Sequence, residues 1–258
     1  MKTVILCGGL GTRLSEETQL RPKPMVTIGG KPILLHVMNL YASRGFKDFI
    51  LPAGYKSEDI KHFFLNYAAL SSDFEVHLST GKVNYISQPN VDWKVTVIDT
   101  GLNTLTGGRL LRLKSLLKDE KMFMLTYGDG LSNVDINKLV SFHKEHGKIA
   151  TLTSVRPPAR FGTMHFDSHG KILEFREKVQ TDEGWINGGF FVFNSTVFDY
   201  LKNGDQTVLE GNPLESLAKD GQLMGFKHDG FWQCMDTIRD RQHLENLWSN
   251  GDAPWVKL

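Results

Sequence analysis

The start of the chain joins an apolar segment to a glycine-rich stretch. Val4-Ile5-Leu6 has the pattern of a short buried strand, and it leads into Gly8-Gly9-Leu10-Gly11-Thr12-Arg13-Leu14. Glycine lets the main chain come close to an anionic ligand and adopt positive φ, and clustered backbone N–H groups bind anions. A basic segment, Arg21-Pro22-Lys23-Pro24-Met25, follows. Because backbone amides, an arginine and a lysine together suit a triphosphate, this region predicts a phosphate-binding loop.

Two other glycine motifs bind phosphates, and neither fits this stretch. In the dinucleotide-binding motif G-x-G-x-x-G a third glycine is needed, but Leu14 stands at that position. Pro22 and Pro24 would also interrupt the long helix that follows such a motif. The P-loop ends in lysine followed by serine or threonine, and no such pair follows these glycines. A glycine-rich surface turn beside an ordinary basic loop is the remaining alternative.

The composition excludes several classes of function. The 258 residues include 30 basic and 29 acidic side chains, and a net charge of +1 gives no bulk attraction to nucleic acid or to a membrane surface. No apolar stretch is long enough to span a bilayer, and Met1 is not followed by a secretory signal pattern. The two cysteines, Cys7 and Cys234, cannot form a disulfide framework. We expect a cytoplasmic protein that acts on a small molecule and binds neither nucleic acid nor a membrane.

The order of apolar segments predicts an α/β fold. Strand-like and helix-like segments alternate in the first half, with helices expected over 58–69 and 108–117. This alternation predicts a Rossmann-like mixed, mostly parallel sheet with helices on both faces. From residue 149 the pattern changes toward strands, one of them over Gly188–Phe193. We expect a single domain over 1–258, with a nucleotide-binding half of about 1–130 and a C-terminal part of about 131–258 that adds strands and a smaller substrate lobe.

Two aspartates follow strand-like segments. Met122–Thr126 is almost continuously apolar, as a strand covered on both faces should be, and Asp129 follows it in Tyr127-Gly128-Asp129-Gly130. Ligands bind at the carboxyl ends of strands in such sheets, so Asp129 is a candidate Mg²⁺ ligand; the alternative is a tight turn. Asp236 follows an aromatic strand and precedes a helix, so it is a second Mg²⁺ candidate or a helix N-cap.

Two further segments carry groups suited to a phosphorylated ligand. Thr104–Arg109 is a second glycine-rich turn, which could seat a phosphate, close over a base, or form a simple helix start capped by Thr106. Glu177-Lys178 and Trp185–Phe190 offer a cation and hydrogen-bonding groups, or else a solvated charge pair and a hairpin. A helix N-terminus contributes only about 0.3–1 kcal/mol toward an exposed anion. Two phosphorylated substrates therefore require several cations, which we take to be Arg13, Lys23, Lys178 and a metal ion.

Some chemistry-bearing residues are expected to be inert. His143 and His146 lie beside Lys144 and Glu145, which suggests a solvated helix face instead of a zinc site. Cys7 lies in no nucleophile motif, so we expect it to pack in the interior.

Together these motifs resemble the signature of sugar-phosphate nucleotidylyltransferases. The opening glycine motif with Lys23-Pro24 is typical of that family, and later segments are most similar to its cytidylyl branch. Those segments are Ser15-Glu16-Glu17-Thr18, Asp99-Thr100-Gly101, Thr106-Gly107-Gly108-Arg109, Tyr127-Gly128-Asp129-Gly130, Arg160-Phe161-Gly162, Asn187-Gly188-Gly189-Phe190-Phe191 and Met235-Asp236-Thr237. The chain departs from the family pattern at Cys7, where alanine is frequent, and at Val179, where proline is usual.

The resemblance implies transfer of CMP from CTP to α-D-glucose 1-phosphate, which gives CDP-glucose and diphosphate for deoxysugar and O-antigen synthesis. It also implies a homo-oligomer, such as a hexamer. The nucleotide-binding residues that it implies are Leu6, Cys7, Gly8, Gly9, Leu10, Gly11, Thr12, Arg13, Lys23, Thr104, Arg109 and Gly128. The sugar-phosphate residues would be Glu177, Lys178, Asn187 and Gly189, the catalytic residues Arg13, Lys23 and Asp129, and the Mg²⁺ ligands Asp129 and Asp236.

The implied reaction is an in-line displacement at the α-phosphorus. The attacking sugar-phosphate oxygen is already anionic, so the reaction needs positioning and charge neutralisation and no general base. Three alternatives stay open: UTP, dTTP or another sugar 1-phosphate as substrate, a non-catalytic nucleotide-sugar sensor, and a dehydrogenase, which the missing third glycine disfavours.

Overall fold

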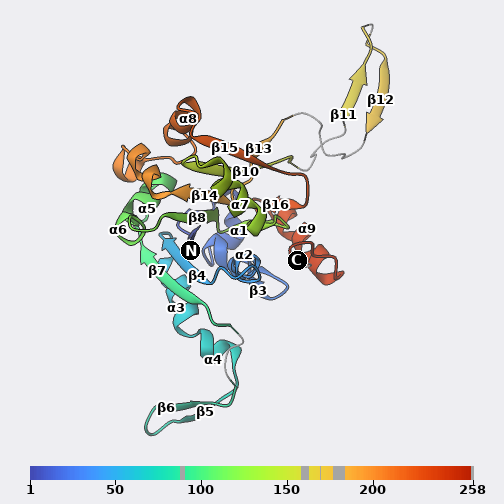
Figure 1. The fold of residues 1–258 in the computed structure, drawn as a ribbon. Helices are drawn as coiled ribbons and strands as arrows, with labels where there is room; N and C mark the ends of the chain where they lie inside the picture. Colours follow the sequence, from blue (N-terminus) through green and yellow to red (C-terminus); the bar gives the residue numbers. More distant parts are fainter. Residues whose placement is uncertain (88–90, 158–162, 169, 177–183, 257–258) are drawn as a thin grey trace.

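The computed structural model describes residues 1–87, 91–157, 163–168, 170–176 and 184–256 (Figure 1). Its main sheet consists of β1 (Lys2–Leu6), β4 (Asp48–Ala53), β7 (Lys94–Asp99), β8 (Met122–Tyr127), β10 (Ala150–Val155), β13 (Ile186–Asn187), β14 (Phe191–Asn194) and β15 (Leu223–His228). The strand order is β13-β10-β14-β8-β1-β4-β7, and β15 pairs with β10. One sheet therefore takes strands from both halves of the chain.

The sheet is mixed and mostly parallel, as the sequence predicts. β1 pairs in parallel with β4 and β8, β4 pairs in parallel with β7, and so does β10 with β15. β14 lies antiparallel between β8 and β10. The carboxyl ends of β1, β4 and β8 consequently lie at the same edge of the sheet.

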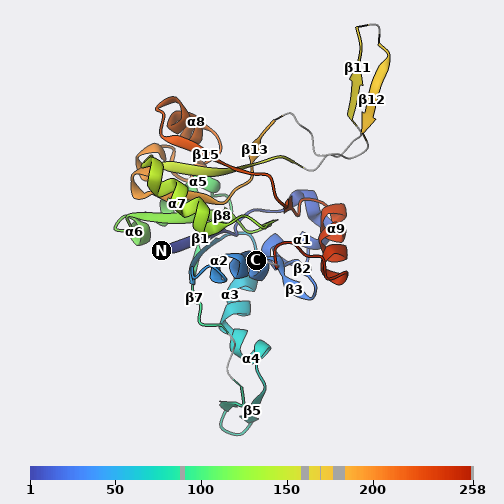
Figure 2. The same cartoon turned by 45° about the vertical axis from the view of Figure 1, so that its right-hand side comes forward.

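Helices cover both faces of the sheet. The helices are α1 (Ser15–Thr18), α2 (Ile33–Ala42), α3 (Ser57–Leu65), α4 (Tyr67–Ser71), α5 (Thr106–Arg112), α6 (Lys114–Leu117), α7 (Ile136–His146), α8 (Asn212–Lys219) and α9 (Ile238–Ser249). Successive residues of a strand point to opposite faces. In β1, Ile5 packs in a buried cluster with residues of α2 and α7, whereas Val4 and Leu6 pack with residues of α5, α6 and α8. The turned view in Figure 2 shows this layered arrangement.

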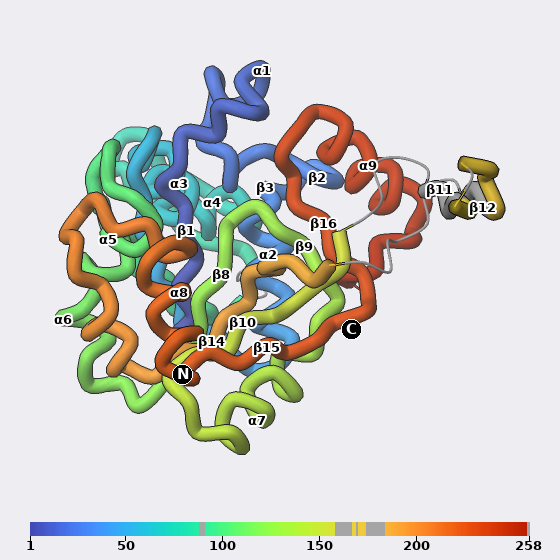
Figure 3. Tube along the Cα trace, turned by 90° about the horizontal axis from the view of Figure 1, so that it is seen from above, coloured from blue at the N-terminus to red at the C-terminus, as the bar shows by residue number. Residues whose placement is uncertain are grey.

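Four two-stranded sheets and four short 3-10 helices complete the part of the chain that the structure describes. The sheets pair β2 (Thr27–Ile28) with β3 (Lys31–Pro32), β5 (Phe74–His77) with β6 (Lys82–Tyr85), β9 (Gly130–Ser132) with β16 (Trp232–Cys234), and β11 (Thr163–Phe166) with β12 (Ile172–Arg176). The 3-10 helices are η1 (Thr12–Leu14), η2 (Lys23–Met25), η3 (Ser195–Tyr200) and η4 (Gly204–Gln206). The β5–β6 hairpin projects from the body in Figures 1 and 2. Figure 3 shows α9 beside β2, so the C-terminal helix packs against the N-terminal segment.

Three predicted elements differ from the observed ones. The helix expected over 58–69 is divided into α3 and α4 at Asn66, whose side chain donates a hydrogen bond to the carbonyl of His62 and so competes with the helix backbone. The helix expected over 108–117 begins earlier, at Thr106, and is interrupted at Leu113. The strand expected over Gly188–Phe193 is interrupted because Gly189 and Phe190 have φ of 78° and 47°, which no strand allows.

The prediction that His143 and His146 lie on a solvated helix face is wrong for His143. His143 is only 1% exposed, and its ring nitrogens lie 2.8 Å from Thr151 Oγ1 and 3.1 Å from Asn194 Oδ1. His146 Nε2 lies 2.7 Å from the same hydroxyl of Thr151. These contacts attach α7 to β10 and β14, which explains why polar residues stand on the buried face of this helix.

No helix among the residues that the structure describes has both the length and the apolar character needed to cross a membrane.

Candidate active site

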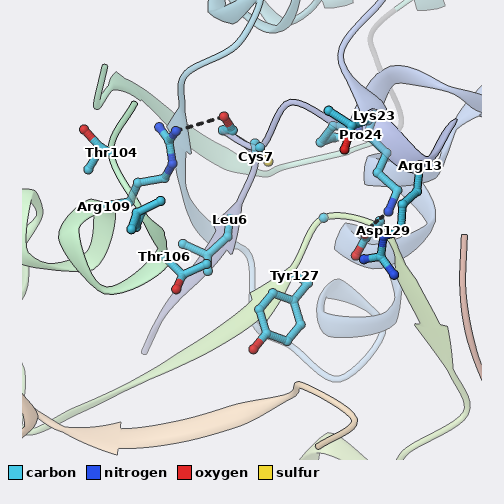
Figure 4. Close-up of a pocket in the computed structure, with 16 residues that line it drawn as sticks. Leu6, Cys7, Arg13, Lys23, Pro24, Thr104, Thr106, Arg109, Tyr127 and Asp129 are labelled. Carbon is cyan, nitrogen blue, oxygen red and sulfur yellow. Dashed lines mark hydrogen bonds and ion pairs between the residues drawn. The ribbon is translucent and has the colours of Figure 1, made fainter. Parts of the chain in front are cut away.

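A cavity of about 370 Å³ opens at the carboxyl ends of β1 and β8 (Figure 4). Gly11, at φ 64°, turns the chain from the glycine stretch into η1. The predicted residues that line the cavity are Leu6, Cys7, Gly8, Gly9, Gly11, Thr12, Arg13, Lys23, Thr104, Arg109, Gly128 and Asp129. Pro24, Leu105, Thr106 and Tyr127 line it as well. Leu10 is not among the lining residues, and its side chain is exposed.

Lys23 is the centre of a charge cluster beside this cavity. Its Nζ lies 2.5 Å from Asp129 Oδ2 and 2.7 Å from Asp236 Oδ1. Arg13 Nη1 lies 2.7 Å from Asp236 Oδ2. The Lys23 side chain is 11% exposed, whereas that of Arg13 is 72% exposed. The structure therefore brings together the four charged residues that the sequence analysis selected from distant parts of the chain.

Strand pairing positions the two carboxylates. Asp129 follows β8, and Asp236 follows β16, which pairs with β9 so that Cys234 lies opposite Gly130. The N–H of Met235 donates to the carbonyl of Asp129. Thr237, not Asp236, is the N-cap of α9: its hydroxyl accepts from the N–H of Asp240 in a capping box. The carboxylate of Asp236 is therefore available to Lys23 and Arg13, so the N-cap alternative is wrong.

The charges in this cluster stabilise one another. Burial alone would lower the pKa of Lys23, but the charges and hydrogen bonds of the two aspartates outweigh it and raise that pKa above its ordinary value. Burial alone would raise the pKa of Asp236, but the contact with Lys23 and the charge of Arg13 lower it instead. Lys23 and Asp236 are therefore both ionised at neutral pH.

The pair of carboxylates fits a hard divalent cation that binds together with phosphates. Within the described ranges no group of three or more His, Cys, Asp or Glu side chains is placed to hold a metal ion. Asp129 and Asp236 nevertheless converge on one point, which the ammonium of Lys23 marks. Mg²⁺ typically takes one or two carboxylates and completes its shell with water and substrate phosphates. The two carboxylates suit that mode.

Arg109 lines the cavity, but its guanidinium group is used to hold loops. The side chain is buried, and it donates to the carbonyl oxygens of Gly8, Ala53, Gly101 and Leu102 and to the hydroxyl of Thr100. A Cβ at Gly8 would lie 2.1 Å from Arg109 Cζ, so glycine is needed there for this close approach. The contacts of Arg109 in this structure make it a positioning residue for the glycine stretch.

The amides of the two glycines in the second glycine-rich turn are already hydrogen-bonded. The N–H groups of Gly107 and Gly108 both donate to the carbonyl of Thr207. A Cβ at Gly108 would lie 2.4 Å from the carbonyl oxygen of Asp205, so this glycine serves close backbone packing. The backbone of another segment already accepts the hydrogen bonds of these two amides, so they are not free to bind a phosphate, and the role of the turn stays a prediction. Thr104 is buried and lines the cavity.

Cys7 packs in the interior as predicted. It is 1% exposed, and its thiol donates to the carbonyl of Ile5. Burial, together with the nearby charge of Asp129, raises the pKa of the thiol far above its ordinary value. Cys7 is thus an unreactive neutral thiol beside the cavity.

The predicted sugar-phosphate residues are placed in part. Glu177 and Lys178 lie outside the described residues. Asn187 Nδ2 donates to the hydroxyl of Tyr127 at 3.3 Å, and Asn187 Oδ1 accepts from the N–H of Gly189 at 2.9 Å. Gly189 is followed by Phe190, which is buried although its φ of 47° is unfavourable for a residue with a side chain. Such backbone strain is frequent at functional sites.

Sequence reasoning missed Tyr127 and Glu210. Tyr127 donates to Glu210 Oε1 at 2.5 Å, and the hydroxyl of Thr106 donates to Glu210 Oε2 at 2.6 Å. Tyr127 could have been found, because it precedes Gly128 and Asp129 in the same motif. Glu210 stands 83 positions from Tyr127 in a segment without a motif, so no local signal indicates it.

A mixed, mostly parallel sheet with a cavity at its carboxyl edge is typical of α/β proteins that bind ligands at the ends of their strands. The chain belongs to the nucleotidyl transferase family, which matches residues 2–238. It is 51% identical over 255 residues to the glucose-1-phosphate cytidylyltransferase of Salmonella typhi, and this match covers 99% of the chain and 98% of the relative. A Bacillus subtilis protein named "Probable glucose-1-phosphate cytidylyltransferase" is 46% identical, with 99% of each chain covered. The resemblance to nucleotidylyltransferases is thereby confirmed.

A solved structure supports the fold. HddC from Yersinia pseudotuberculosis, complexed with GMP-PN, superposes with a TM-score of 0.69 and covers 96% of this chain and 99% of its own. At 22% identity this likeness shows the fold alone.

Proposed function

We propose that the chain transfers CMP from CTP to α-D-glucose 1-phosphate and releases diphosphate and CDP-glucose. The observation that carries this proposal is the convergence of Lys23, Arg13, Asp129 and Asp236 beside the glycine stretch. The two relatives named above support cytosine as the base and glucose 1-phosphate as the acceptor. Nucleotide sugars of this kind feed deoxysugar and O-antigen synthesis, which we propose as the use of the product.

The residues of the site suit an in-line displacement at the α-phosphorus. A phosphate monoester loses its second proton with a pKa of about 6, so the attacking oxygen is anionic at neutral pH and needs no base. The ammonium of Lys23 has three N–H donors, of which the two aspartates use two, and the third is available to a phosphate oxygen. The exposed guanidinium of Arg13 can hold the leaving diphosphate in a bidentate manner. Asp129 and Asp236 would hold Mg²⁺, which supplies further neutralisation of phosphate charge.

The experiment that tests this function is a diphosphate-release assay that crosses four nucleoside triphosphates with several sugar 1-phosphates. We expect turnover with CTP and glucose 1-phosphate and values of kcat/KM at least tenfold lower for the other pairs. Faster turnover with UTP or dTTP would reassign the base. Absence of diphosphate release with every pair, while CDP-glucose still binds, would favour a nucleotide-sugar sensor.

We also propose that copies of the chain assemble into a homo-oligomer in the cytoplasm. Apolar side chains are exposed around the projecting hairpin, among them Leu70, Leu78 and Ile86. Beside them α3, α4 and β7 form an apolar cavity of about 560 Å³ lined by Phe64, Tyr67 and Trp93. Patches of this kind typically mark interaction surfaces. Light scattering after size exclusion should give a multiple of the chain mass, and Leu78→Asp should reduce it; a monomer at micromolar concentration would contradict the assembly.

A further inference from the structure

Residues 203–210, called the strap here, pack against the start of α5, where Leu105 and Thr106 line the cavity. The carbonyls of Asp205 and Thr207 accept from the N–H groups of Leu105 and Gly107 at the start of α5. Asp205 also forms an ion pair with Arg112 at 2.6 Å. The strap therefore has a fixed position against α5, and its last residue, Glu210, contacts Thr106 and Tyr127, which line the cavity.

The carboxylate of Glu210 is held between two residues that line this cavity. Its two oxygens each accept one hydrogen bond, from Tyr127 at 2.5 Å and from Thr106 at 2.6 Å. An ionised carboxylate offers about four lone-pair sites, so each oxygen can accept a further hydrogen bond. Glu210 is exposed, and both of its partners line the cavity. The carboxylate thus offers aligned acceptors at the cavity border.

The same hydrogen-bond chain extends to the strained turn at Asn187. Tyr127 uses its proton toward Glu210, and its oxygen accepts from Asn187 Nδ2 at 3.3 Å. The carbonyl of Gly188 accepts from Trp232 Nε1, and that of Phe190 accepts from the hydroxyl of Thr153. These contacts hold the turn in its unfavourable backbone conformation, so the acceptors are pre-organised before a ligand binds.

Charge decides which part of a substrate Glu210 can contact. A carboxylate repels phosphate groups. Lys23 and Arg13, the cations that suit phosphates, lie across the cavity from Thr106, a hydrogen-bond partner of Glu210 (Figure 4). The hydroxyl of Tyr127 points away from Asp129 in the same view. The donors that complement an anionic acceptor are neutral hydroxyl groups, which a hexose supplies.

We propose that Glu210 is a specificity-determining residue that accepts a hydrogen bond from a ring hydroxyl of the hexose 1-phosphate, with Tyr127 and Asn187 as its positioning residues. This inference rests on the proposed nucleotidyl transfer. It adds a contact that comes from the strap, far from the glycine stretch and from the aspartates.

The test compares Glu210→Gln with Asp205→Asn in the full-length protein. Glu210→Gln keeps the size of the side chain and removes the charge, and it should raise KM for glucose 1-phosphate about tenfold or more, as expected for loss of one charge-assisted hydrogen bond. The KM for CTP should change less than about twofold. Asp205→Asn removes the ion pair with Arg112 but keeps the backbone hydrogen bonds of the strap and the carboxylate of Glu210, so it should not give this selective loss.

Deoxyglucose 1-phosphates identify the hydroxyl. The analogue that lacks the contacted hydroxyl should bind the wild-type enzyme more weakly than glucose 1-phosphate does. The same analogue should bind Glu210→Gln about as weakly as it binds the wild type, because its contact with Glu210 is already absent. A rise in KM for CTP instead would point to the ribose and overturn the proposal. An unchanged KM, or equal effects of both variants, would overturn it too.

Equilibrium binding separates this inference from the proposed function. If the wild-type protein turns over no substrate, the nucleotidyl transfer fails, but calorimetry with glucose 1-phosphate still decides the role of Glu210. Equal binding of glucose 1-phosphate to the wild type and to Glu210→Gln, or binding to neither protein, would then overturn the proposed role of Glu210.

Discussion

Replacement of Lys23 by methionine separates the catalytic contribution of its ammonium from the structural one. The ammonium lies 2.5 Å and 2.7 Å from two carboxylate oxygens, and the side chains of Asp129 and Asp236 are 25% and 12% exposed. Breaking a buried ion pair costs about 3–5 kcal/mol. Because Asp129 is partly hydrated, we expect the lower end of that range, about 3 kcal/mol of the free energy of unfolding, without added metal.

Magnesium should reverse this loss of stability but not the loss of activity. A cation that binds the native state with a hundredfold excess over its Kd returns about 2.7 kcal/mol, and in Lys23→Met the two carboxylates have no ammonium between them. Loss of one preorganised charge partner in a transition state lowers kcat by about 10²–10³-fold. Because the wild-type reaction already uses Mg²⁺, adding it cannot replace the missing ammonium.

The assay combines urea unfolding, with and without Mg²⁺, and diphosphate release at saturating Mg²⁺. Lys31→Met, an exposed lysine in β3, is the matched control and should alter neither quantity. If Mg²⁺ restores the activity of Lys23→Met to within tenfold of the wild type, the assigned role of the ammonium is refuted. If stability falls equally with and without Mg²⁺, the two aspartates do not form a common cation site.

Further predictions concern packing, pH and loop positioning. Gly108→Ala forces a methyl group against the backbone of Asp205 and should lower the free energy of unfolding by about 1–3 kcal/mol; Gly9→Ala, which meets no atom within 4 Å, should change it little, and equal losses in urea unfolding would contradict this. Burial, aided by the charge of His146, lowers the pKa of His143 below 6.5 although the hydrogen bond to Asn194 raises it. As the pH falls, His143 of the unfolded chain binds a proton before His143 of the folded chain does, so the stabilisation by the neutral ring is complete above pH 6.5 and is lost as the pH falls through the native pKa. The free energy of unfolding, measured with urea, should fall less between about pH 7.5 and 5.5 in His143→Gln than in the wild type. An equal fall in both proteins would refute the assignment. Arg109→Lys retains the charge but has too few N–H donors for the five oxygen atoms that Arg109 contacts. The variant should therefore release Gly8 and raise KM for CTP about tenfold. An unchanged KM would show that Gly8 needs no such support.

The fold class could be predicted because its signals are local. The apolar run Met122–Thr126 and the glycines after β1 encode strand and turn within a few residues, and the observed sheet confirms them. The division at Asn66 and the positive φ of Phe190 could not be predicted, since each depends on a specific side-chain contact or on tertiary packing. The single-domain organisation stays a prediction, which the sheet shared by both halves supports.

In the candidate site, too, residues in local motifs could be predicted and residues held by tertiary contacts could not. Lys23 and Asp129 could be selected because each lies in a recognisable motif with a chemical reason for its residue type. Glu210 and the burial of His143 could not be, because Tyr127 and Asn194, which contact them, are distant in sequence and only the folded chain brings them together. The roles of the site residues stay predictions until substrates are bound.

A crystal structure with a non-hydrolysable CTP analogue and Mg²⁺ would show whether one triphosphate engages both the glycine stretch and the charge cluster. We expect the triphosphate to lie against the N–H groups of Gly8 to Gly11, with Lys23 Nζ within about 3.2 Å of an α-phosphate oxygen and Arg13 on the terminal phosphates. A triphosphate bound elsewhere, with Lys23 still neutralised only by Asp129 and Asp236, would contradict it.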